Sequence, residues 1–72
     1  MPNRIVSVYV QVTGTFTNVK VCVNEKTSVQ QILELLREKC YVSTVHEITS
    51  DGRHLGIHEL FKVSHATVKG SP

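Results

Sequence analysis

Two stretches near the start of the chain alternate valine with polar residues. Every second residue is valine from Val6 to Val12, and the pattern returns up to Val23. Because successive side chains of a β-strand point to opposite faces, this alternation predicts strands over 5–12 and over 16–23, each with one apolar face. Gly14 lies between them and suits a tight turn, since glycine tolerates positive φ. We therefore expect an antiparallel hairpin that needs another element to cover its valines.

The hydrophobic spacing changes to about 3.6 residues after Thr27, which predicts an amphipathic helix over residues 28–40. Ser28 and Gln31 have the form of a capping box, in which each side chain binds the backbone N–H of the other residue. The expected apolar face consists of Val29, Ile32, Leu33 and Leu36, and Cys40 follows the same face. This face is the expected cover for the hairpin.

The second half of the chain predicts shorter elements. In chain order these are a third strand over 41–49, a turn over 50–52, a short fourth strand over 54–56, a helical turn or coil over 57–63, and a very short last strand over 66–69. We expect residues 70–72 to be frayed. No repeat or linker divides the chain, so residues 1–72 are expected to form one domain, as a module of a larger protein.

Composition narrows the range of functions. The chain has 8 basic and 6 acidic residues, a net charge of +2, and its basic residues are scattered rather than clustered. We therefore expect no nucleic-acid binding, which typically uses a basic patch. No apolar run approaches the roughly 20 residues of a membrane span, and no charged-then-apolar leader comes before the first strand pattern. We expect no membrane span and a cytoplasmic location.

The two cysteines lack CxxC spacing, and they fall on different kinds of surface. Cys22 lies on the polar face of the second predicted strand, and Cys40 follows the apolar face of the helix. Side chains on opposite sides of a sheet are poor disulfide partners, so free thiols in a reducing compartment are expected rather than a disulfide. Cys22 has no evident base nearby in the sequence, and Ser50 and Asp51 have turn composition. We therefore expect that the chain is not an enzyme and that it binds no cofactor.

Four histidines are spread over the second half of the chain, at His46, His54, His58 and His65. His54 and His58 are spaced i, i+4, but zinc would need two further ligands in tetrahedral geometry. We expect surface histidines with a mild response between about pH 6 and 7, and no metal site.

The order of elements resembles the ubiquitin-like β-grasp fold. The spacing of Val23, Ser28, Ile32 and Leu36 is similar to that by which the second strand of ubiquitin enters its capped helix, and residues 51–55 resemble its turn between third and fourth strands. The resemblance implies an α+β domain with a four- or five-stranded mixed sheet packed on one main helix. It also implies that the second strand is an edge of the sheet.

Within this superfold, residues 45–59 resemble Ras-association and Ras-binding domains, with a Val-x-Glu strand, an Asp-Gly turn and an Arg-x-Leu step. The resemblance implies a non-catalytic signalling module that binds a small Ras-type GTPase through the edge of the second strand. The matching basic residues are Arg4 on the first strand, Lys20 on the second, and Arg37 and Lys39 on the helix. Asn18 and Cys22 share the polar face of the second strand with Lys20 and complete the expected contact.

A second use of the same fold stays open. Ubiquitin-type receptors bind an apolar patch on the exposed sheet face, for which this chain offers Tyr9 and Phe16. The alternative function is thus a ubiquitin-like domain that such receptors recognise, or an assembly scaffold. Covalent conjugation is disfavoured, because the sequence ends in Lys-Gly-Ser-Pro rather than in two glycines. The identity of the partner and the oligomeric state are left open.

Overall fold

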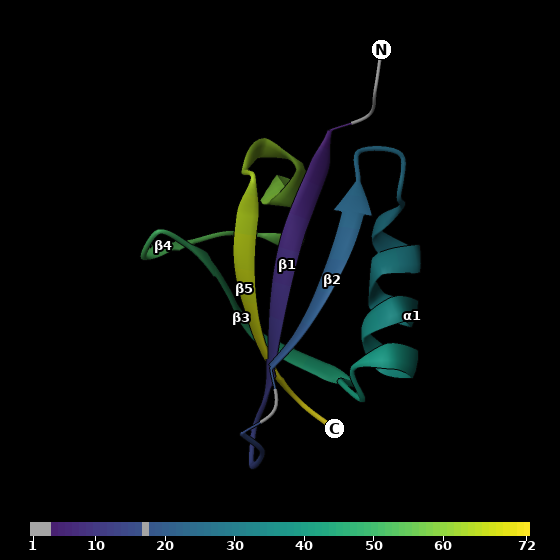
Figure 1. The fold of residues 1–72 in the computed structure, drawn as a ribbon, viewed down its shortest axis with the longest axis vertical. Coiled ribbons are helices and arrows are strands. Elements are labelled where there is room, and N and C mark those ends of the chain that lie inside the picture. The colour runs from purple at the N-terminus through teal and green to yellow at the C-terminus, as the bar shows by residue number, and fades with distance from the viewer. Residues whose placement is uncertain (1–3, 17) are drawn as a thin grey trace.

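The computed structural model describes residues 4–16 and 18–72. They form an α+β domain with a five-stranded mixed sheet and one main helix (Figure 1). The elements are β1 (Ile5–Val12), β2 (Asn18–Asn24), α1 (Val29–Lys39), β3 (Thr44–Ser50), β4 (Arg53–His54), the 3-10 helix η1 (Ile57–Lys62) and β5 (His65–Ser71).

The strand order in the sheet is β2-β1-β5-β3-β4. β1 and β5 are parallel neighbours, and the other adjacent strands are antiparallel. This order is consistent with a β-grasp-like arrangement. It places β2 at one edge of the sheet, as expected, and the two-residue β4 at the other. The long edge of the sheet is therefore β2.

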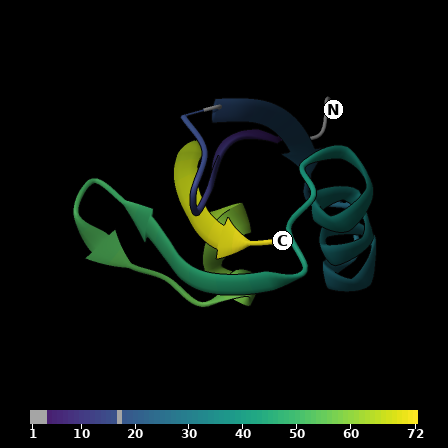
Figure 2. The same cartoon turned by 90° about the horizontal axis from the view of Figure 1, so that it is seen from below.

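The core lies between the inner face of the sheet and the two helical segments. The valines of β1 alternate as predicted, and Val6, Val8 and Val10 are fully buried. The sheet is strongly curved, with α1 next to β2 and with β3 running away from the helix toward the β3–β4 turn (Figure 2). η1 closes the core with Leu60, which is fully buried. Burial of these apolar side chains is the main stabilising contribution to the fold.

Helix α1 begins as predicted. The Ser28 hydroxyl accepts from the N–H of Gln31 at 3.1 Å, and the Gln31 side chain accepts from the N–H of Ser28 at 3.0 Å. The apolar face is narrower than expected, because only Ile32 and Leu36 are buried within the helix. Leu33, expected in the core, is 41% exposed. It lies on the flank of the stripe that Ile32 and Leu36 direct at the sheet, so the prediction for Leu33 is wrong.

Several strand boundaries differ from the prediction. β2 begins at Asn18, and Phe16 lies in the preceding loop; residue 17, which the predicted strand included, lies outside the described residues. β3 begins at Thr44 rather than at residue 41, because Tyr41 has a φ of 58°, which an extended strand does not allow. β4 covers Arg53–His54 and does not reach residue 56.

The C-terminal residues correct another expectation. β5 runs over His65–Ser71, so Gly70 and Ser71 belong to a strand and are not frayed. The Gly70 carbonyl accepts from the N–H of Thr13 at 2.8 Å, and the Ser71 carbonyl accepts from the N–H of Ser43 at 2.9 Å. Because β5 lies between β1 and β3, hydrogen bonds hold both of its sides to the end.

Candidate functional site

The edge strand β2 presents backbone groups that its neighbour β1 does not use. Residue pairs in an antiparallel ladder alternate between hydrogen-bonded and non-hydrogen-bonded. The N–H of Glu25 donates to the Arg4 carbonyl at 3.3 Å, so in the observed register Val19, Val21 and Val23 direct their backbone groups to β1. The N–H and C=O groups of the even-numbered residues therefore point away from the sheet. We call Asn18, Lys20 and Cys22 the open edge.

One end of this strand is closed by its own turn. The N–H of Thr27 donates to the Asn24 carbonyl at 2.9 Å, and the Asn24 N–H donates to the Thr27 hydroxyl at 3.3 Å. The Asn24 side chain in turn accepts from the N–H of Lys26 at 2.9 Å. The outward backbone groups of Asn24 are thus satisfied locally, and the edge that remains available coincides with the three β2 residues predicted from the sequence.

The side chains of the open edge lie on the outer face of the sheet, opposite the core. Asn18, Lys20 and Cys22 are all exposed. The Lys20 ammonium lies over the ring of Tyr9, its cross-strand partner, at 5.9 Å from the ring centroid. A cation in this position is attracted to the negative face of the ring. Lys20 is therefore held above the outer face, next to the backbone groups of the edge.

The other three predicted basic residues do not gather around Lys20. Arg4 lies just before β1 and donates from Nη1 to the Phe61 carbonyl of η1 at 3.2 Å, so its side chain reaches toward η1. Arg37 and Lys39 are both exposed, but residues two apart on a helix do not face each other. Lys39 lines a groove together with Val19 of β2. Of these three basic residues, only Lys39 therefore shares a surface feature with the start of β2.

The sequence pattern does not predict this groove. It has a volume of about 370 Å³ and is predominantly apolar. Its walls come from the end of β1, the hairpin, the end of α1 and the last residue: Val12, Thr15, Val19, Lys39, Cys40, Tyr41 and Pro72. The sequence signal that could have indicated it is Tyr41, a large aromatic residue directly after the helix, at a position that favours glycine.

The outer sheet face offers little of the apolar patch that the alternative function needs. Tyr9 is 42% exposed in the middle of β1, whereas Phe16 is fully exposed in the hairpin loop, beyond the ends of both strands. The cross-strand neighbours on this face are polar, with Thr67 beside Tyr9 and Lys69 beside Gln11. Tyr9 and Phe16 therefore do not form one surface.

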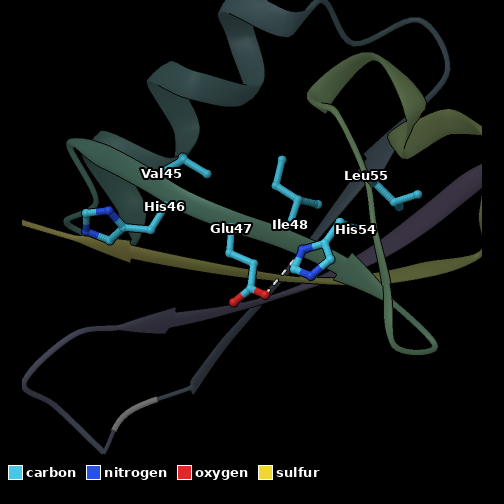
Figure 3. A pocket seen from close by; sticks show the side chains of 6 residues that line it. All are labelled: Val45, His46, Glu47, Ile48, His54 and Leu55. Carbon is cyan, nitrogen blue, oxygen red and sulfur yellow. Dashed lines mark ion pairs between the residues drawn. The ribbon is translucent and has the colours of Figure 1, made fainter.

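A second hollow, of about 540 Å³, is open and lies along β3 and β4 (Figure 3). Figure 3 shows Glu47 facing His54, with Nδ1 of His54 at 3.3 Å from the Glu47 carboxylate. The Lys69 ammonium lies 3.9 Å from the other carboxylate oxygen. These cross-strand pairs are solvent-accessible, and such pairs contribute little to stability. The arrangement contains no nucleophile positioned beside a base, and it gives the hollow no evident chemistry.

His46 and His65 have separate partners. His65 lies 3.1 Å from the Asp51 carboxylate, and His46 lies 2.9 Å from the Ser71 hydroxyl. His54 is in β4 and His58 is in η1, so the two do not share a helical face. Within residues 4–16 and 18–72, no three side chains of His, Cys, Asp or Glu come together in a way that could hold a metal ion.

Both cysteines are free thiols, in contrasting surroundings. Cys22 is exposed on the open edge, and Cys40 is 1% exposed at the end of α1. Burial raises the pKa of the Cys40 thiol, because removal from water penalises the thiolate. Cys40 therefore behaves as a core residue rather than as a nucleophile.

Among the described residues, no helix has the length and apolar character needed to cross a membrane. Comparisons of the chain with protein-family models, with curated proteins and with solved structures found no match.

Proposed function

We propose that this chain is a non-catalytic protein-interaction module of the ubiquitin-like β-grasp type, which binds an extended segment of a partner protein along the open edge of β2. The observation that carries the proposal is that the outward backbone groups of Asn18, Lys20 and Cys22 point away from β1, while those of Asn24 are closed by Thr27. A sheet edge of this kind can accept an additional strand, in which main-chain hydrogen bonds supply affinity.

The two edges of the sheet differ in a way that favours β2. β4 has only two residues, both exposed, and one of them is an arginine. A short, charged edge strand is a common means of preventing strand addition. β2 has seven residues and presents three consecutive outward positions. An incoming strand would therefore find more backbone partners at β2.

The partner class that we propose is a small Ras-type GTPase, within a cytoplasmic signalling protein of which this chain is one module. This class comes from the resemblance of residues 45–59 to Ras-association domains and is supported by the position of Lys20. A positive charge beside the edge attracts an acidic segment and accelerates association more than it slows dissociation.

The test is an NMR titration of the ¹⁵N-labelled chain with a panel of Ras-type GTPases, each loaded with a GTP analogue or with GDP. We expect one GTP-loaded member to shift the amide signals of Asn18, Lys20 and Cys22. Lys20→Glu is expected to weaken this binding on the order of tenfold, mainly through slower association. Lys62→Glu, an exposed charge reversal on η1, is the matched control and should leave binding unchanged.

Three outcomes would speak against this function. No binding to any loaded GTPase removes the proposed partner class. An equal effect of Lys62→Glu shows that only net charge matters and that the open edge is not the site. Shifts centred on Tyr9 and its neighbour Thr67, without shifts at the open edge, would place the contact on the outer sheet face, the face that the alternative function uses, and would remove the open edge as the site.

A further inference from the structure

The apolar groove begins where the open edge ends, and the register of β2 connects the two. Val19 directs its backbone to β1 and its partly buried side chain to the inner face, where it lines the groove. In a strand added to β2, the residue opposite Val19 would direct its side chain to the same face, with the two Cβ atoms about 5 Å apart. That side chain would lie at the mouth of the groove, beside Lys39.

We propose that this groove is the specificity pocket of the open edge and that it receives an aliphatic or aromatic side chain from the partner's strand. The inference rests on the proposed function, because it assumes that a strand pairs with β2. The groove volume of about 370 Å³ is ample for one large side chain, and its lining is predominantly apolar. Strand addition uses such pockets to select among segments whose backbones are all alike.

The charges around the open edge indicate which residue types the partner's strand carries. Lys20 lies on the outer face and Lys39 lies at the groove on the inner side. A residue opposite Lys20 would point to the outer face, so a carboxylate there would meet the ammonium group. Because faces alternate along a strand, the partner segment is an extended peptide in which an acidic residue adjoins the apolar residue that enters the groove.

Tyr41 provides an independent reason to assign a role to the groove. It has a φ of 58°, in the left-handed region that favours glycine, and yet its side chain is 75% exposed and contributes little to the core. A large aromatic side chain in this backbone conformation gives the fold no evident benefit. Its place on the wall of the groove fits a side chain that contacts a ligand, since aromatic residues are common anchors at interfaces.

The experiment uses the ¹⁵N-labelled chain and three blocked pentapeptides. The first has the sequence Thr-Leu-Glu-Leu-Thr, which reads the same in both directions and so fits a parallel or an antiparallel strand. The second replaces both leucines with serine, and the third replaces the glutamate with lysine. We expect the first peptide to shift the amide signals of Val19, Lys20, Cys22 and Tyr41. The other two are expected to bind at least about tenfold more weakly.

The variant Tyr41→Gly distinguishes binding of a side chain in the groove from pairing of a strand with the open edge. The variant should bind the leucine peptide more weakly and leave the affinity for the serine peptide unchanged. Equal affinities for the leucine and serine peptides, with shifts confined to the open edge, would overturn the groove assignment and leave strand addition intact. No shift of the open-edge amides with any peptide would overturn strand addition itself. Shifts of the same signals on dilution, without peptide, would show that a second copy occupies the site and would overturn a peptide occupant.

Discussion

Gly70 of β5 lies against the backbone of Thr44, at the start of β3. A β-carbon placed on Gly70 would come within 2.5 Å of the Thr44 carbonyl oxygen and would also meet the side chain of Val42. The φ angle of Gly70 is not in the left-handed region, so glycine is needed here for space rather than for backbone freedom. This close approach lets β5 pair with β1 and β3 up to its last residues.

Gly70→Ala is therefore expected to destabilise the fold by about 2 kcal/mol or more, because a backbone carbonyl cannot move aside as a flexible side chain can. Urea unfolding followed by circular dichroism measures the loss. Gly56→Ala is the control, since its added carbon would make an ordinary contact of 3.6 Å with the flexible Glu59 side chain. Equal stabilities of the two variants would contradict the steric argument.

The capping box at the start of α1 gives a second prediction. Ser28→Ala removes the acceptor for the Gln31 N–H, at a cost of about 1 kcal/mol. Ser43→Ala, in the exposed segment before β3, is the matched substitution outside the helix and should change stability by less than about 0.5 kcal/mol. Thermal or urea unfolding of both variants compares the two costs directly. If Ser28→Ala is as stable as Ser43→Ala, the capping hydrogen bonds contribute nothing to α1.

Local patterns account for the parts of the fold that were predicted well. The bounds of β1 and the capping box of Ser28 and Gln31 follow from short-range periodicity and capping chemistry. The expected strand β5 was too short, because residues 70 and 71 owe their order to strands far away in the sequence. Nothing local in a Gly-Ser-Pro ending indicates a neighbour on each side.

The candidate site was likewise predicted only where it depends on local sequence. Alternation along β2 was enough to predict that Asn18, Lys20 and Cys22 share a face. The sequence could not show that Arg4 turns toward Phe61, or that Lys39 meets Val19 at a groove, because both depend on how the curved sheet positions segments far apart in the chain. The sharp turn at Tyr41 also escaped prediction, since tyrosine rarely adopts a positive φ.

The buried thiol of Cys40 predicts a pH dependence of stability. Burial raises its pKa in the folded state above the ordinary value of 9.0, so the thiolate forms more readily in the unfolded chain. The stability that this difference contributes is fully present below about pH 9 and is lost as the pH rises through the raised pKa.

Urea unfolding at about pH 8 and about pH 10 tests this, in a Cys22→Ser background that prevents intermolecular disulfides. The parent chain is expected to lose more stability between the two pH values than the same chain with Cys40→Ala. Identical losses in both proteins would show that Cys40 ionises equally well in the folded and unfolded chains.

Tyr41→Gly tests whether the fold itself needs the aromatic side chain. A left-handed conformation costs a non-glycine residue roughly 1–2 kcal/mol, whereas glycine adopts it freely but loses more backbone entropy on folding. Because Tyr41 is 75% exposed, its replacement removes little buried surface. We expect stability to stay the same or to rise by up to about 1 kcal/mol, as measured by urea unfolding. Tyr41→Ala, which keeps the strained backbone without the ring, is the control and should be less stable than Tyr41→Gly. A marked loss of stability in Tyr41→Gly would mean that the ring supports the fold, and it would remove the reason for assigning the side chain to a ligand.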